Sequence, residues 1–456
     1  MTTPISSGIT ERYADFSLAL RYEDLPPEVI ADARNGLLDT LGVALVGSSE
    51  QATRMILNVS AGGTSGGSAT VLGADALATP TVAALVNGYA AHALDYDDTQ
   101  HNVGTHMSAP VVPAALVLAE RLHRSGKDLL TAYVAGFEVG CRLGRAGRFA
   151  THLSKRGIHA TGYLGHFGAA AAAGKLLGLD APQIRRSFGI AAGHASGILK
   201  NFGTMGKAQN AGNAAQNAVL AVLLAGEGFT GPEEIFDGEQ NIFSICGSQT
   251  NPEELFDGLG QQFEITSNTL KVFACAGWRN PIVEACMLLA ADHRLRPADI
   301  KKVNILAWKG VQHLPNYPEP RTGLESKFSA EHAAAVALTD QAGGVRQFSD
   351  ERVADPVVKE LCRKVKLQFD EGLGPYQIRV LIHTSDGREF SHFIPSQKGD
   401  HLNPLSWDEL VTKFHANAAA VLLEDQVEKL TAMIRNLEAV DDVAELTRLC
   451  RPAKGR

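Results

Sequence analysis

Residues 377–394 read QIRVLIHTSDGREFSHFI and give the clearest indication of secondary structure in the second half of the chain. Polar and apolar residues alternate on both sides of a Ser-Asp-Gly stretch at 385–387. Such alternation predicts two half-buried strands, and an Asp-Gly dipeptide between them is typical of a tight hairpin turn. The chain therefore contains at least one antiparallel pair of strands.

The sequence before this hairpin changes from helical to strand spacing. Further alternating runs at 302–308 and 364–369 predict strands, and stretches near 280–292 and 326–338 have helical spacing. We predict that residues 268–402 form a small α+β domain with an antiparallel sheet.

Both ends of the chain have the spacing of helices. Prolines at 26–27 and a Thr-Pro pair at 79–80 are typical of helix starts. Apolar residues recur at helical intervals, with many Ala and Gly, over 29–41, 79–88, 129–143, 165–177, 213–224 and 407–449. The prediction is a mainly α protein, in which residues 1–267 and 403–456 form one large all-helical domain beside the α+β domain.

Composition limits the classes of function. The chain has 456 residues, 45% hydrophobic and 20% charged, with a net charge of −8. This favours a globular protein and gives no basic field for nucleic acid. There is no apolar run of about 18 residues to span a membrane and no secretory signal at the start, so we expect a cytoplasmic protein.

Cysteine placement argues against the common inorganic cofactors. The six cysteines are dispersed, which disfavours disulfides, structural zinc and an iron–sulfur cluster. No GxGxxG follows a predicted strand, so a nicotinamide cofactor has no support. We expect no cofactor and no metal.

Titratable residues are densest at 92–106, where three Asp and three His lie within fifteen residues. Three interpretations remain open: a metal site, a solvated acidic loop, or an acid–base site in which carboxylates orient imidazoles. His159, at an expected helix start, is either structural or catalytic.

Two other stretches could bind anions. Residues 200–207 place glycines around Lys207 and Thr204, which suits an anion-binding loop or a tight turn between helices. Lys271 and Arg279 are either carboxylate clamps or solvated surface charges.

Taken together, these stretches resemble the MmgE/PrpD family, which includes 2-methylcitrate dehydratase, cis-aconitate decarboxylase and iminodisuccinate epimerase. The resemblance spans nearly the whole chain. It is carried by HALDYDDT at 92–99, TH at 105–106, GIHAT at 157–161, HFGAAAAAG at 166–174, NFGTM at 201–205 with Lys207, Lys271 with Asn280-Pro281, and ESKFS at 325–329.

The resemblance implies a homodimer with its active site between the two domains and a small polycarboxylate as substrate. By position, Asp95, Thr99, His106, His159, Lys207 and Lys271 match residues that line the family's pocket. We predict a catalytic set of His106, His159, Lys207, Lys271 and Asp95, and a substrate-binding set of Thr99, Gly203, Thr204, Arg279 and Asn280. The chain departs from the family's pattern at Ala160, and Asn210, Ala276 and Asn280 stand where imidazoles are common.

The chemistry of the side chains suggests different roles for the lysines and the histidines of such a site. Lys207 and Lys271 would bind carboxylates, while His106 and His159 would move protons. Asp95 would orient a histidine or the Thr99 hydroxyl. We predict a cofactor-independent lyase, either decarboxylase or dehydratase. The alternatives are an epimerase of a dicarboxylate and a non-catalytic carboxylate-binding relative.

Overall fold

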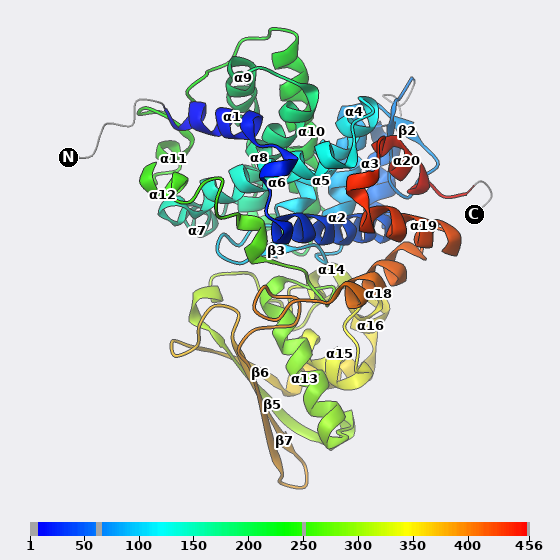
Figure 1. Ribbon diagram of the computed structural model, residues 1–456. Helices are drawn as coiled ribbons and strands as arrows, with labels where there is room; N and C mark the ends of the chain where they lie inside the picture. Colours follow the sequence, from blue (N-terminus) through cyan, green and yellow to red (C-terminus); the bar gives the residue numbers. More distant parts are fainter. Residues whose placement is uncertain (1–7, 61–65, 249–251, 454–456) are drawn as a thin grey trace.

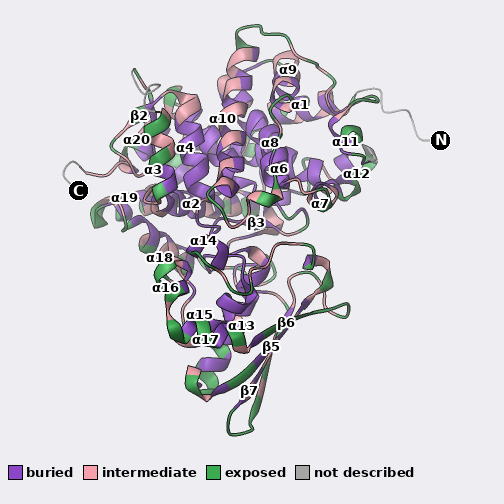
Figure 2. Ribbon diagram, turned by 180° about the vertical axis from the view of Figure 1, so that it is seen from behind, coloured by how far each residue is buried: buried purple, intermediate pink, exposed green. Residues whose placement is uncertain are grey.

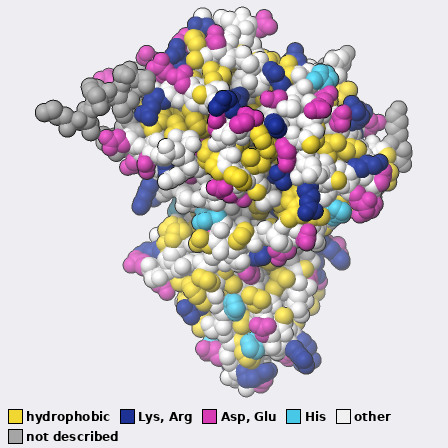
Figure 3. Space-filling model, in the orientation of Figure 1, with side chains coloured by type: hydrophobic (Ala, Val, Ile, Leu, Met, Phe, Trp, Pro, Cys, Tyr) yellow, Lys and Arg dark blue, Asp and Glu magenta, His cyan; other side chains and the backbone are white. Residues whose placement is uncertain are grey.

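The computed structural model describes residues 8–60, 66–248 and 252–453, and it has a larger helical part and a smaller part joined at a narrow waist (Figures 1 and 3). The first and the last described helices, Ile9–Ala19 and Val443–Leu449, both lie in the larger part (Figure 1). Its helices are α1 (Ile9–Ala19), α2 (Pro27–Ser48), α3 (Gln51–Ser60), α4 (Pro80–His92), α5 (Ser108–Arg121), α6 (Gly126–Arg145), α7 (Phe149–Lys155), α8 (Ala160–Leu177), α9 (Ala181–Ala192), α10 (Gly206–Gly226), α11 (Ile242–Ile245), α12 (Pro252–Phe256), α18 (Trp407–Ala418), α19 (Glu424–Arg435) and α20 (Val443–Leu449).

The helical segments predicted from spacing are confirmed. Helix α2 has proline in its first turn, and the Thr79 hydroxyl caps α4 by accepting from the Val82 N–H. Small residues let the helices approach closely: a Cβ added at Gly136 of α6 would lie 2.4 Å from the carbonyl oxygen of Gly168 in α8. The central helices are almost entirely buried (Figure 2).

The smaller part is a four-stranded sheet covered by helices. Its helices are α13 (Asn280–His293), α14 (Gly323–Ser326), α15 (Ala330–Asp340), α16 (Asp350–Ala354) and α17 (Pro356–Lys364), and its strands are β5 (Ile300–Trp308), β6 (Val365–Asp370), β7 (Ile378–Thr384) and β8 (Glu389–Ile394). Buried residues alternate with exposed ones along β7, so one face of the sheet packs on helices.

The prediction of an antiparallel sheet is wrong in one respect. The strand order is β6-β5-β7-β8, and β5 pairs with β6 in parallel while the other two pairs are antiparallel. The chain between β5 and β6 includes helices α14 to α17, and such a crossover can return a strand in the parallel direction. The hairpin at 377–394 is confirmed as β7–β8.

The prediction of an all-helical larger part also needs correction. Two short antiparallel pairs accompany the helices: β1 (Ala69–Thr70) with β2 (Leu77–Ala78), and β3 (Thr99–Gln100) with β4 (Asn268–Thr269). The second pair joins the loop after α4 to the segment that leads into the smaller part.

Two hydrophobic cores follow the two parts of the molecule. The larger core includes buried residues from α1 through Ile265 and again from α18 to α20. The smaller core gathers α13, α15 and the sheet, and also takes Val43, Leu94 and Tyr96 from the helical part. The boundaries 1–267, 268–402 and 403–456 stay a prediction. Among the described residues, no helix is long and apolar enough to cross a membrane.

Candidate active site

Four segments far apart in the sequence converge near the waist. They are the stretch from the end of α4 through β3 to His106, the start of α8, the first turn of α10, and the chain just after β4. Helix α10 packs against both α4 and α8, which brings Lys207 beside the loop after α4. Helix α10 begins at Gly206, so Lys207 lies on a helix and not in the loop suggested by its glycine-rich surroundings.

Asp95 is held between two buried ammonium groups. Its Oδ2 lies 2.8 Å from Nζ of Lys207, and its Oδ1 lies 2.6 Å from Nζ of Lys271. Lys271 also donates to the Asp95 carbonyl oxygen at 2.9 Å. The left-handed backbone of Asp95, with φ of 53°, presents carboxylate and carbonyl to the same lysine. Such strain in a non-glycine residue persists only where its surroundings hold it in place.

The charges of this trio depend on one another. Burial alone would raise the pKa of the Asp95 carboxyl, but Lys207 and Lys271 together hold that pKa well below its usual value. Burial lowers the pKa of Lys207, and Asp95 only partly offsets this. For Lys271 the carboxylates of Asp95 and Asp97 outweigh burial, so its pKa is raised. Asp95 is therefore an ionised partner of two lysines.

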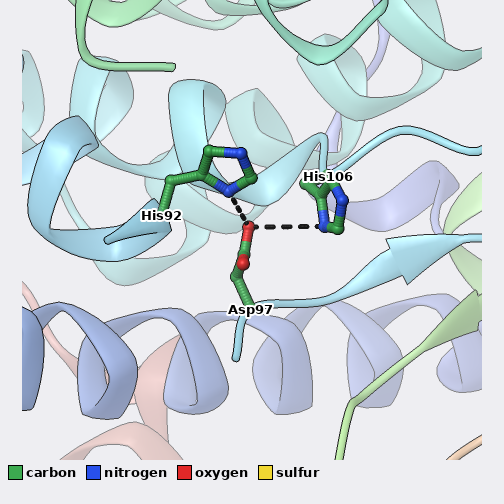
Figure 4. Close-up of side chains that lie close together, drawn as sticks. All are labelled: His92, Asp97 and His106. Carbon is green, nitrogen blue, oxygen red and sulfur yellow. Dashed lines mark hydrogen bonds and ion pairs between the residues drawn. The ribbon is translucent and has the colours of Figure 1, made fainter. Parts of the chain in front are cut away.

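Asp97, and not Asp95, lies beside the histidines, and it is hydrogen-bonded to His92. Nδ1 of His92 lies 2.7 Å from Oδ2 of Asp97, and Nδ1 of His106 lies 3.5 Å from the same oxygen (Figure 4). The expectation that Asp95 would orient a histidine or the Thr99 hydroxyl is therefore wrong. The turn at Asp95 sends its carboxylate toward the lysines, and Asp97, two residues later, faces the imidazoles.

The hydrogen bonds assign a tautomer to each imidazole. Nδ1 of His106 lies 2.6 Å from the Asp98 carbonyl oxygen, which only accepts, so the ring proton is on Nδ1 and Nε2 carries a lone pair. The Asn210 amide donates to Nδ1 of His159 at 3.1 Å, so the proton of that ring is on Nε2. His106 and His159 therefore present opposite functions at Nε2, one accepting and one donating.

Both imidazoles are neutral at neutral pH. Burial lowers the pKa of His106 well below its usual value, and the Lys271 ammonium lowers it further. Burial likewise lowers the pKa of His159, with help from His92 and Lys207. A neutral imidazole can accept a proton at once, and an entering anion would restore part of the lost basicity.

His92, Asp97 and His106 are the residues nearest to a metal-binding arrangement. Their ligand atoms lie within 4.8 Å of one another. Two ligands about 2.1 Å from a tetrahedral metal stand about 3.4 Å apart, whereas Nδ1 of His92 and Oδ2 of Asp97 are 2.7 Å apart. As placed, these atoms bond to each other. That no metal is needed stays a prediction.

The substrate-binding residues expected from the sequence divide into two groups. Thr99 is buried, with its hydroxyl 3.4 Å from Nδ1 of His106. Thr204 lines a small cavity together with Asp95 and Lys207. Gly203 has φ of 82°, and a Cβ there would lie 2.9 Å from the Tyr317 hydroxyl. Its lack of a side chain is thus required by the packing of the loop.

Arg279 and Asn280 are bound to the backbone. Arg279 donates to the carbonyl oxygens of Pro315 and Phe328 and stacks on Trp278. Burial lowers its pKa to about 9. The Asn280 side chain accepts from the Phe273 N–H and donates to the Cys275 carbonyl oxygen. The contacts of both residues brace the segment after Lys271.

The match to known proteins covers nearly the whole chain. The model of the MmgE/PrpD N-terminal domain matches residues 11–255, and that of the MmgE/PrpD C-terminal domain matches residues 273–439. The chain belongs to the MmgE/PrpD family. Similar proteins include the cis-aconitate decarboxylases of Homo sapiens (32% identical over 459 residues, covering 97% of this chain and 95% of the relative), Mus musculus (32% over 460, 97% and 93%) and Aspergillus terreus (27% over 471, 97% and 96%).

Four residues of this MmgE/PrpD site were absent from the predicted set. His92 and Asp97 lie in the predicted titratable cluster, but spacing gave no reason to prefer them. The Asn210 amide is hydrogen-bonded to Nδ1 of His159. Lys327 lines the cavity with Asp95 and Lys207, and it lies in the ESKFS stretch at 325–329, which carries the resemblance but was not used to choose site residues.

Proposed function

We propose that this MmgE/PrpD protein is a cofactor-independent lyase that removes CO2 or water from a small di- or tricarboxylate. The main support is that the Lys207–Asp95–Lys271 trio lies close to two neutral imidazoles of opposite tautomer, His106 and His159. The activity of the relatives makes cis-aconitate the first candidate substrate, and the resemblance to the wider family makes 2-methylcitrate the second. All six cysteines are free and buried, which supports the cytoplasmic location expected from the sequence.

The arrangement suits decarboxylation of an unsaturated tricarboxylate. When the bond to the leaving carboxylate breaks, its electron pair moves through the neighbouring double bond to the far carbon, which then takes one proton. Donors aimed at the developing charge lower the barrier. Lys207 and Lys271 supply positive charge, the Nε2–H of His159 supplies a neutral donor, and Nε2 of His106, once protonated, supplies the proton.

The same groups suit dehydration. Nε2 of His106 would take a proton from the carbon next to a carboxyl group. The hydroxyl on the adjacent carbon would then leave with one proton as water, and a double bond would form. The choice between the two reactions depends on which bond of the substrate lies beside His106.

Epimerisation is the second candidate, because Nε2 of His106 accepts a proton and Nε2 of His159 carries one. The ring centroid of His92 lies 4.9 Å from that of His106 and 5.6 Å from that of His159. Two such bases on opposite faces of a carbon would exchange its proton and invert it without loss of mass.

A panel of polycarboxylates in D2O, followed by NMR and CO2 detection, separates these reactions. The expected result is CO2 or water loss from one member, reduced about 10²–10⁴-fold in kcat by His106→Gln or His159→Gln. His123→Gln, at a histidine whose side chain is 72% exposed, should leave kcat unchanged. Deuterium entry without mass loss would establish the epimerase, and no change across the panel would favour a binding protein.

A further inference from the structure

The positive charges around the cavity exceed the negative ones. Lys207 and Lys271 face the carboxylates of Asp95 and Asp97, the latter 3.9 Å from Lys271. These two lysines are therefore matched by two carboxylates. A third lysine, Lys327, lines the same cavity as Lys207 and Asp95, and the carboxylates of Asp95 and Glu50 act on it only from beyond ion-pair distance.

Lys327 is buried without a carboxylate partner. It is 3% exposed, and its Nζ donates to the Ala274 carbonyl oxygen at 3.1 Å. Within residues 8–60, 66–248 and 252–453 no carboxylate oxygen lies within 4.0 Å of this ammonium group. A buried cation is costly unless it is paired, and an ammonium group has three donors, of which one is used here.

The backbone holds Lys327 in place at the edge of the cavity. Its carbonyl oxygen accepts from the Ala276 N–H at 3.0 Å, and Arg279 donates to the carbonyl of the next residue, Phe328. The ring of Phe328 lines the cavity beside it. Burial lowers the pKa of Lys327 to about 8, as expected for an ammonium group that lacks an anionic partner.

We propose that the Lys327 ammonium group binds one carboxylate of the substrate. This carboxylate is not the part of the substrate that Lys207 and Lys271 stabilise. The proposal rests on the proposed function, which makes the ligand a polycarboxylate. The ammonium pairs with a carboxylate that does not leave, and so fixes which end of the substrate lies beside the imidazoles.

The cavity that Lys327 lines is small. Its volume is about 10 Å³, which is room for about one water molecule, and Asp95, Thr204, Met205, Lys207 and Phe328 also line it. A polycarboxylate needs more space, so side chains must shift when it enters. Thr204 and Met205 are exposed members of this wall.

Binding of tricarballylate, a saturated tricarboxylate without the reacting double bond, tests the proposal by calorimetry without turnover. Lys327→Gln removes the charge and keeps a donor for the Ala274 carbonyl. We expect its dissociation constant to rise about 10- to 100-fold, the range for one lost charge-assisted hydrogen bond. Lys302→Met, at an exposed lysine of β5, should change it less than twofold.

Truncated ligands show whether one carboxylate is responsible. Glutarate and succinate each lack one carboxylate of tricarballylate, and for at least one of them the Lys327→Gln effect should fall below threefold. Equal losses for all three ligands, or a loss no larger than that of Lys302→Met, would overturn the proposal. Lys327→Met serves as the second variant if the Gln variant does not fold.

The same titrations separate this inference from the proposed function. If the wild-type protein binds tricarballylate and Lys327→Gln binds it equally well, Lys327 is not the anchor and the proposed substrate class stands. If the wild-type protein binds none of the three ligands at millimolar concentration, both proposals fail.

Discussion

Replacing Asp95 by Asn removes the negative charge between two buried ammonium groups and keeps the side-chain volume. One lysine then faces an amide N–H₂ group in place of a carboxylate oxygen. Breaking a buried ion pair by removing one partner costs about 3–5 kcal/mol. The loss has an upper limit, because the unpaired lysine can lose its proton instead of staying charged. For a lysine with an unfolded pKa of about 10.4, deprotonation at pH 7 costs about 4.6 kcal/mol. We expect the free energy of unfolding to fall by about 3–4.6 kcal/mol.

Equilibrium urea unfolding measures this loss. Tryptophan fluorescence is a suitable probe because Trp278 is buried next to Arg279. Asp425→Asn is the control, since Asp425 and Lys429 form a surface pair with both side chains more than 60% exposed. A loss for Asp95→Asn no larger than that of this control would refute the charge balance described above.

The pH dependence of the same variant has a definite sign. The folded pKa of Asp95 is depressed, so its contribution is present above the unfolded value of about 3.9 and is lost as pH falls through the folded pKa. In the variant, burial of an unpaired ammonium group lowers the free energy of unfolding. This cost disappears as pH rises toward about 10.4, because the lysine is then neutral in the unfolded state too. The difference between wild type and variant should therefore be widest near neutral pH and narrow at both extremes.

Three further expectations concern the imidazoles, metals and assembly. Asn210→Asp would place a carboxylate acceptor beside Nδ1 of His159, so the ring proton would move to Nδ1 and the pKa of that imidazole would rise. We expect kcat to fall about 10²-fold or more. An unchanged kcat with an unchanged pH profile would contradict the tautomer assignment. Exhaustive chelation should leave activity intact, whereas a stoichiometric ion on His92, Asp97 and His106 whose removal abolishes activity would refute cofactor independence. Light scattering should report a homodimer at micromolar concentration, and a monomer would count against it.

Local signals in the sequence predicted most of the fold. The periodicity at 165–177 and the Thr-Pro start at 79–80 depend only on near neighbours, and both reappear as α8 and α4. The Asp-Gly hairpin is equally local. The parallel pairing of β5 with β6 was not predictable in this way, because it depends on how a long crossover packs and leaves no mark in either strand.

The candidate site was predictable as a set of residues but not as a set of contacts. The resemblance placed Asp95, His106, His159, Lys207 and Lys271 in one pocket, and the structure brings them together. The partner of each residue depends on backbone direction. Whether Asp95 or Asp97 meets the histidines was decided by one left-handed residue that the sequence does not mark.

The three positions that lack a family imidazole differ in what replaces it. Asn210 holds Nδ1 of His159, and Asn280 braces the segment 273–275 with both ends of its amide. Each asparagine side chain therefore holds a neighbouring group in place by hydrogen bonds. Ala276 offers only its backbone N–H to Lys327, and its methyl side chain cannot take the place of the imidazole that the resemblance implies there.

Ala276 is therefore the position at which this chain's reaction should diverge from that of the decarboxylases. Restoring an imidazole beside Lys327 with Ala276→His should increase CO2 release from cis-aconitate about 10-fold or more, because one added proton-transfer group contributes in that range or above it. Ala276→Asn adds similar polarity without proton transfer and is the matched control. If both variants release CO2 at the wild-type rate, residue 276 does not choose the reaction, and that choice rests with the groups held by Asp95 and Asp97.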